Sequence, residues 1–249
     1  MIGVTPDRQC GVRRGLILVL GSVLVTACFQ QSLPDLSHLP EAPEAFPHLK
    51  YETLAAQGWQ LKSVDPKRTQ IIARVYKAGR LARLGHNHIV STQQPQGRVA
   101  LHNDRSKADL FVRLDQLEID RPDLRALAGP GFESTPDAED VSGTRANMLS
   151  DKVMSAPVWP FAMATIEGEI GSRAESLWRT RLNLHGHSHD ILVPVVVNRN
   201  SDEITVEGRI DQLDLSAFQI PQFSILGGAV RVAEQVDIGF SIVVDTSAR

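Results

Sequence analysis

The sequence predicts a mainly β protein, an antiparallel barrel with one helix packed on or across it. Two observations predict this fold. Apolar and polar residues alternate over several short segments, and a single stretch carries the signals of a helix start. Alternation gives each strand one apolar and one polar face, as in antiparallel sheets. Many strands with one crossing helix favour a closed or nearly closed barrel, because closure removes exposed strand edges.

The N-terminus has the pattern of an export signal. A region with three arginines precedes an apolar stretch, residues 15–26, which is shorter than the roughly 20 residues that a membrane-spanning helix needs. The stretch ends in Val-Thr-Ala before Cys28, which resembles a bacterial lipobox. We expect residues 1–27 to be a lipoprotein signal peptide and Cys28 to carry lipid. An ordinary signal peptide or an uncleaved anchor is the alternative.

Sorting and cysteine chemistry follow from this signal. Residue 29 is Phe and not the Asp of an inner-membrane retention signal, which favours the outer membrane, with the protein facing the periplasm. Cys10 lies in the segment that would be removed. The mature chain then has no cysteine for a disulfide, for thiolate catalysis or for a cysteine-based zinc site.

Charge argues against nucleic acid as a partner. The chain has 26 basic and 29 acidic residues, and removal of residues 1–27 leaves 23 and 28, a net charge of about −5. Nucleic-acid binding usually needs a basic surface. We expect membrane association through the lipid anchor at Cys28 and not through a basic patch.

The mature chain divides into a tether and one domain. Residues 28–57 form the lipidated N-terminus and a Pro-rich tether, with a weak helix over 51–57. Residues 58–246 have the right length for one domain.

The strands of this domain follow from the alternation. It is clearest over residues 236–245 and recurs over 109–115, 181–185 and 204–210. The continuous apolar run 193–197 predicts a strand buried on both faces. The apolar positions that we expect on the barrel interior are Leu110, Val112, Leu114, Leu182, Leu184, Ile238, Phe240 and Ile242. Alternation alone does not distinguish a hollow barrel from a packed one.

One segment has helix signals instead. Thr135 offers an N-cap, Pro136 follows it, and three acidic residues favour the positive end of a helix dipole. We expect a helix over residues 137–154 and a shorter turn near 122–127. Gly227 and Gly228 predict a turn between strands.

Several stretches together resemble YceI-like proteins. Residues 75–88 resemble the first hairpin of that family, residues 144–150 with Trp159-Pro160 its helix and next strand, and residues 182–186 its Leu-x-Leu-His-Gly strand. Residues 193–197 and 214–218 resemble two later segments, in the family's order. The resemblance implies an exported, extended antiparallel barrel of lipocalin-like shape. It also implies a non-enzymatic role, with a long apolar interior that binds an isoprenoid chain such as a quinone or polyprenyl lipid.

Histidines form the densest polar chemistry of the chain, and two of them, His187 and His189, depart from the family's pattern. They occur at every second position in two runs, which are His86 and His88, then His185, His187 and His189. On extended backbone each run would present imidazoles on one face. Two histidines of the second run with one of the first could bind zinc or copper. The alternative is that they are hydrogen-bonded polar residues near a barrel mouth.

Three functions therefore stay open at this point. The first is a lipid-anchored, non-enzymatic binding barrel for an isoprenoid-type lipid. The second is a metal-binding or metal-dependent envelope protein on the same barrel, and the third is a structural envelope protein. Ser188 lies in a strand-to-strand context, which argues against a hydrolase nucleophile.

Overall fold

The computed structural model describes residues 32–171 and 175–247, so the predicted signal peptide and Cys28 lie outside the described residues. Within that part of the chain, twelve strands form one antiparallel sheet. The strands are β1 Gln60–Ser63, β2 Gln70–Ala78, β3 His88–Thr92, β4 Gln96–His102, β5 Arg105–Arg113, β6 Glu118–Ile119, β7 Phe161–Glu169, β8 Ser176–Leu184, β9 His187–Arg199, β10 Glu203–Asp214, β11 Ser224–Ile225 and β12 Val230–Asp245.

Helices are few and short in the same residues. The α-helices are α1 His48–Ala56, α2 Pro122–Ala126 and α3 Ala138–Leu149. The 3-10 turns are η1 Ala82–Leu84, η2 Leu114–Gln116, η3 Leu215–Phe218 and η4 Leu226–Gly228. None of the helices described is long and apolar enough to span a bilayer.

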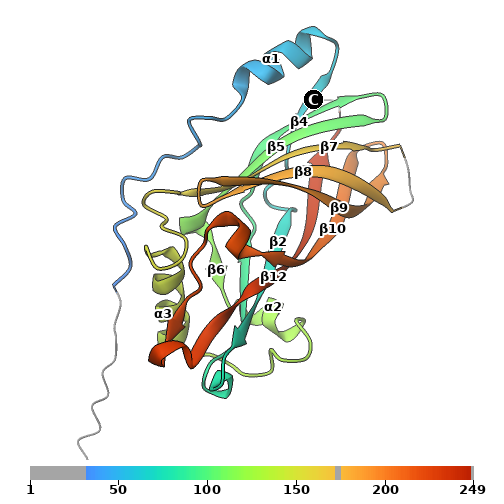
Figure 1. Ribbon diagram of the computed structural model, residues 1–249. Coiled ribbons are helices and arrows are strands. Elements are labelled where there is room, and N and C mark those ends of the chain that lie inside the picture. Colours follow the sequence, from blue (N-terminus) through green and yellow to red (C-terminus); the bar gives the residue numbers. More distant parts are fainter. Residues whose placement is uncertain (1–31, 172–174, 248–249) are drawn as a thin grey trace, which may run out of the picture. The chain divides into compact units, whose positions relative to one another are not determined.

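The sheet curls into a barrel-like wall. Its strand order is β1-β4-β5-β7-β8-β9-β10-β12-β2-β3-β6. Residues 93–95 join β3 directly to β4, so the strands from β4 round to β3 form a circuit that the chain itself closes. Figure 1 shows β4, β5, β7, β8 and β9 crossing the steeper pair β2 and β12. This arrangement confirms the predicted antiparallel, lipocalin-type fold class.

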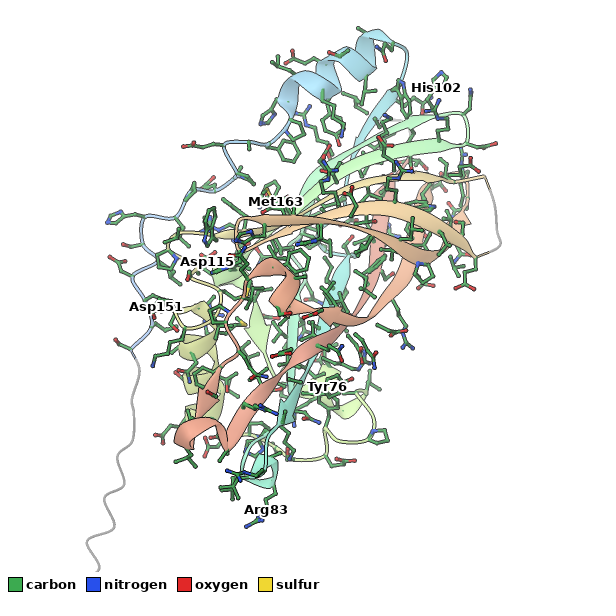
Figure 2. The ribbon with its side chains drawn as sticks, viewed as in Figure 1. Tyr76, Arg83, His102, Asp115, Asp151 and Met163 are labelled. Carbon is green, nitrogen blue, oxygen red and sulfur yellow. The ribbon has the colours of Figure 1, made fainter. Side chains whose placement is uncertain are left out.

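The inner face of the wall carries the main core. Alternate residues of the long strands pack into two apolar clusters. The first is centred on Val193, Val195 and Ile242, and the second on Phe218 and Val236. Partly buried Ile210 contacts both clusters, so the apolar interior is continuous along β10. Side chains also project from the outer face of the sheet (Figure 2).

Helix α1 lies against the outer face of β4, in the segment that we expected to be a tether (Figure 1). Its Tyr51 is fully buried and donates a hydrogen bond of 2.8 Å to Asp109 Oδ2. Lys50 and Thr165 also donate to this carboxylate, at 2.6 and 2.7 Å. Burial, followed by the charge of Asp109, raises the pKa of Tyr51. The predicted weak helix is therefore present, and a buried carboxylate fastens it to the sheet.

The predicted long helix is shorter than expected. Helix α3 begins after Asp137, whose side chain accepts a hydrogen bond from the Asp140 amide. Asp137 and not Thr135 is therefore the N-cap. Ser150 adopts extended backbone angles and ends the helix. The short turn near 122–127 is confirmed as α2, and Gly227 and Gly228 form the predicted turn with positive φ.

The prediction for residues 193–197 was wrong about burial. Val193, Val195 and Val197 are buried on the inner face, but Val196 is 39% exposed on the outer face. The run is apolar on both sides because Pro194 and Val196 line an outer cleft. A continuous apolar sequence therefore marks a surface opening here and not a second buried layer.

Candidate functional site

A small apolar cavity lies inside the barrel, within the first core cluster. Its volume is about 60 Å³. Aliphatic residues form most of the wall, with Trp178, Thr180 and Ser106 as its polar members. Sites for small molecules usually measure 300–1,000 Å³. The interior is therefore apolar and nearly filled, and a long chain enters only if core side chains move apart.

The wall of the barrel has a seam between β9 and β10. The ladder between these strands ends at the pair Val195 and Gly208. Beyond this pair, in the described residues, 187–194 of β9 pair with β8, and 209–214 of β10 follow β12 with a bulge at residues 211 and 212. Pro194 has no amide hydrogen to donate at this point. We call the unpaired stretch between residues 187–194 and 209–214 the seam.

Turn η3 covers the seam. Its Phe218 is 1% exposed and packs in the second core cluster, which also includes Leu182 of β8. His189 of β9 contacts Phe218 edge to face, with 4.9 Å between ring centres. The Nε2 atom of His189 lies 2.7 Å from the Ala217 carbonyl oxygen. A carbonyl only accepts, so this nitrogen carries the hydrogen and donates it.

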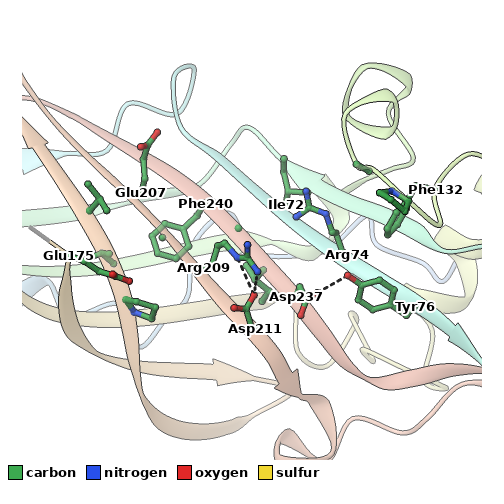
Figure 3. A pocket seen from close by; sticks show the side chains of 18 residues that line it. Ile72, Arg74, Tyr76, Phe132, Glu175, Glu207, Arg209, Asp211, Asp237 and Phe240 are labelled. Carbon is green, nitrogen blue, oxygen red and sulfur yellow. Dashed lines mark hydrogen bonds and ion pairs between the residues drawn. The ribbon is translucent and has the colours of Figure 1, made fainter.

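An open cleft of about 900 Å³ lies outside the seam (Figure 3). Six charged side chains line it, and with two arginines against four carboxylates its formal charge is −2. They are Arg74, Arg209, Glu175, Glu207, Asp211 and Asp237. Tyr76 donates a 2.6 Å hydrogen bond to Asp237, which lowers the pKa of that carboxyl.

Two residues separate the cleft from the interior. Val195 and Phe240 line both the outer cleft and the inner cavity. The Phe240 ring lies over Gly208, where a Cβ would come within 2.6 Å of it. Glycine at 208 therefore lets the aromatic ring close the wall just where the ladder ends.

The predicted interior residues fall into three groups. Leu110, Phe240 and Ile242 line the inner cavity. Leu182, Leu184 and Ile238 pack in the second core cluster. Val112 follows the inward alternation of β5, but Leu114 lies in η2 and packs with Leu149 and Ala156 in a separate cluster. The alternation fails at Leu114 because β5 ends one residue earlier.

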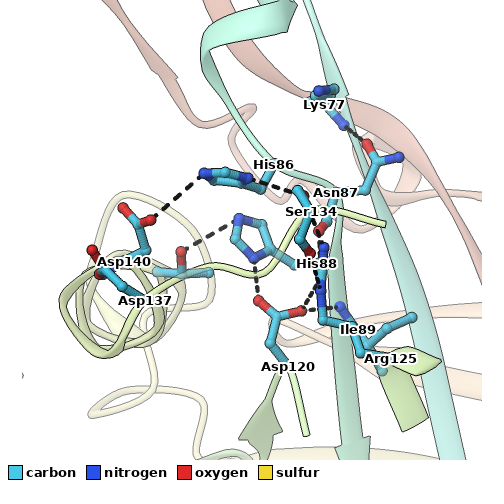
Figure 4. Close-up of polar contacts among 11 residues, drawn as sticks. Lys77, His86, Asn87, His88, Ile89, Asp120, Arg125, Ser134, Asp137 and Asp140 are labelled. Carbon is cyan, nitrogen blue, oxygen red and sulfur yellow. Dashed lines mark hydrogen bonds and ion pairs between the residues drawn. The ribbon is translucent and has the colours of Figure 1, made fainter. Parts of the chain in front are cut away.

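His86 and His88 belong to a polar network that holds α2 and α3 against β3 (Figure 4). His88 Nδ1 lies 2.6 Å from Asp120 Oδ2, and its Nε2 lies 3.4 Å from the Thr144 hydroxyl. Asp120 also accepts from Arg125 and from the Ile89 amide.

Two opposing effects set the acidity of Asp120. Burial acts to raise its pKa, but the hydrogen bonds from His88 and Ile89 outweigh burial and lower it. The side chains of His88 and Asp120 are 15% and 1% exposed. This network ties three elements together.

The second run is not a row of imidazoles on one strand. Leu184 pairs with His187, and His185 and Gly186 form the two-residue turn between β8 and β9, with φ of 51° and 77°. The expectation of extended backbone was therefore wrong for His185. His86 precedes β3 and so does not lie on that strand with His88. Only His187 and His189 share a strand face.

The two runs stay apart in the sheet. Strands β3 and β9 are separated by β2, β12 and β10 in the strand order. In the part of the chain that the structure describes, no three histidine, cysteine or acidic side chains gather as a metal site. Both nitrogens of His88 and the Nε2 of His189 have hydrogen-bond partners. These hydrogen bonds connect His88 to Asp120 and Thr144, and His189 to the η3 turn.

Sequence reasoning missed Trp178. It is 7% exposed and stands on the inner face of β8 in line with Leu182 and Leu184. The alternation of residues 181–185, continued backwards by four residues, points to it. The cleft residues Arg74 and Tyr76 had no such signal, because they lie on the outer face of β2.

Comparison with known proteins supports the fold. No family model and no curated protein matches the chain. Among solved structures, BcnA of Burkholderia cenocepacia aligns with a TM-score of 0.52 and 15% identity, over 72% of this chain and 98% of that one. A polyisoprenoid binding domain from Saccharophagus degradans, implicated in plant cell wall breakdown, aligns with a TM-score of 0.50 and 12% identity, over 76% and 100%.

A mutant CJ YceI protein made for nanotechnology applications aligns less well. Its TM-score is 0.44 at 10% identity, over 62% of this chain and 82% of that one. The first two alignments cover almost all of their partner chains. The part of this chain that aligns with BcnA and with the polyisoprenoid binding domain therefore shares their fold, and the described strands form a lipocalin-type barrel.

Proposed function

We propose that the protein is an exported, lipid-anchored and non-enzymatic binding protein that holds an isoprenoid-type lipid inside its barrel. The observation that carries the proposal is the continuous apolar interior, in which two core clusters meet at Ile210. A solved polyisoprenoid binding domain with the same fold supports it. The sequence motifs that resemble YceI-like proteins point to the same ligand class.

The seam offers a way for the nearly filled interior to open. Since no ladder pairs join 187–194 to 209–214 in the described residues, these strands can part without losing backbone hydrogen bonds there. The contacts to be displaced are the His189 hydrogen bond to η3 and the packing of Phe218. Phe240 and Val195 would then no longer divide the cleft from the cavity.

Extraction of the purified protein tests lipid binding directly. We expect organic extraction of the folded protein, isolated from its own cell envelope, to release an isoprenoid lipid that mass spectrometry identifies. A folded sample that releases no lipid would contradict the proposal. An extract that contains only the bulk phospholipids of the envelope would do the same.

The anchor and the location are a separate part of the proposal. The lipobox-like sequence before Cys28 and the Phe at position 29 support a lipid anchor in the outer membrane, with the barrel facing the periplasm. Metabolic labelling with palmitate tests this, with Cys28→Ser as the variant and Cys10→Ser as the matched control. We expect Cys28→Ser alone to lose the label. Label retained in Cys28→Ser would exclude this anchor.

A further inference from the structure

A buried hydrogen-bond donor inside the barrel has no partner. The Nε1 atom of Trp178 is inaccessible to solvent and accepts or donates no hydrogen bond within the described residues. An indole nitrogen is a donor only, and buried donors in folded proteins nearly always find an acceptor. Trp178 is one of the residues that line the apolar cavity.

The fold holds the indole in place. Trp178 pairs with Val193 across β8 and β9, and its ring lies on Gly168 of β7, where any Cβ would overlap the indole. The glycine therefore makes room for the ring. Because tight packing fixes the indole, it cannot easily turn its nitrogen toward a protein acceptor.

Trp178 is part of a polar row in an otherwise apolar wall. Ser176, Trp178 and Thr180 alternate along the inner face of β8. The Ser176 hydroxyl is also buried without a partner. Such a row disfavours a purely apolar filling, because each unpaired buried polar group costs free energy.

We propose that Trp178 is a ligand-binding residue, whose Nε1–H donates to an acceptor oxygen on an uncharged end group of the bound lipid. The inference rests on the proposed function and narrows its ligand class. Among the described residues, the cavity wall has no charged side chain, so an anionic end group would be buried there without a charged partner. Trp178 therefore selects a carbonyl or hydroxyl end over a diphosphate, a carboxylate or a bare hydrocarbon.

Indole NMR tests this on the ¹⁵N-labelled full chain, which has three tryptophans. The probes are geranylgeraniol, with an uncharged oxygen, geranylgeranyl diphosphate, with a charged end, and squalene, with no oxygen. We expect geranylgeraniol to shift one indole N–H signal downfield, the signal that Trp178→Phe lacks. Squalene should leave the position of that signal unchanged, as should geranylgeranyl diphosphate.

Affinities complete the test. Trp178→Phe should weaken geranylgeraniol binding about tenfold and leave squalene binding unchanged, while Trp159→Phe, which alters an exposed indole, should change neither. If all probes weaken equally in Trp178→Phe, the residue only packs and the inference is wrong. If the indole signal does not move when geranylgeraniol binds, the inference is also wrong, since a buried water then already accepts the hydrogen bond from Nε1–H.

The same data separate the two claims. Binding of geranylgeraniol without an indole shift leaves the lipid-binding function standing and removes Trp178 from it. If the wild-type chain binds none of the three probes, the proposed function fails, and the role of Trp178 fails with it.

Discussion

Filling the inner cavity should weaken lipid binding without unfolding the barrel. Ala108 is 8% exposed, lies on the inner face of β5 and lines the cavity of about 60 Å³. Ala108→Val adds two carbons beside empty space. Burying them is worth up to about 1.6 kcal/mol at ~0.8 kcal/mol per methylene, and imperfect fit reduces this gain. We expect the lipid-free variant to gain about 1 kcal/mol, or roughly 2–4 °C in Tm.

Thermal denaturation with and without geranylgeraniol measures the effect on binding. A ligand at 100 times its Kd stabilises a protein by about 2.7 kcal/mol. If Ala108→Val weakens binding tenfold, the same concentration is 10 times Kd and gives about 1.4 kcal/mol. The ligand-induced rise in Tm should therefore fall to about half.

Ala78→Val is the matched control, because Ala78 lies in β2 on the outer alternation and away from the cavity wall. It should leave the ligand-induced rise in Tm as in the wild type. An equal rise in Ala108→Val and the wild type would refute the placement of the ligand in this cavity.

Three further predictions follow from the contacts. Tyr51→Phe removes the donor to Asp109 and to the Arg98 carbonyl, and should lower the free energy of unfolding in urea by about 1.5–3 kcal/mol; no change would show that this pair does not fasten α1. His189→Ala removes the hydrogen bond to η3, and the loss of about 1 kcal/mol should raise amide exchange rates over residues 215–220 about five- to tenfold, whereas His187→Ala should not raise them. Equal rates in His189→Ala and the wild type would show that this hydrogen bond does not hold η3 over the seam. The lowered pKa of Asp120 gives stability that is complete above about pH 4 and is lost as pH falls through the folded-state value, so Asp120→Asn should flatten urea stability below about pH 4, and an unchanged slope would contradict this.

The strands and their inward faces could be predicted from the sequence because burial repeats with the period of the backbone. Ile238, Phe240 and Ile242 face inward in β12 as the alternation indicates. The same reasoning fails where the backbone leaves the strand. Leu114 falls in a 3-10 turn, and His185 in a two-residue turn with positive φ, although the glycine that follows it is a turn signal.

The seam and the cleft could not be predicted, because both depend on which strands pair and where pairing stops. The ladder between β9 and β10 ends at Val195, and nothing in the apolar run 193–197 marks that point except Pro194. The contact of His189 with η3 joins residues 28 positions apart. Spacing within one run cannot reveal such a partner.

The central claim is that the barrel interior holds one isoprenoid-type lipid. Native mass spectrometry of the folded protein, purified from its own envelope, tests it most directly. The account predicts a complex heavier than the denatured chain by the mass of one uncharged, oxygen-bearing isoprenoid lipid. In Ala108→Val a smaller fraction of the molecules should carry this extra mass. Equal masses of the folded and denatured protein would contradict it.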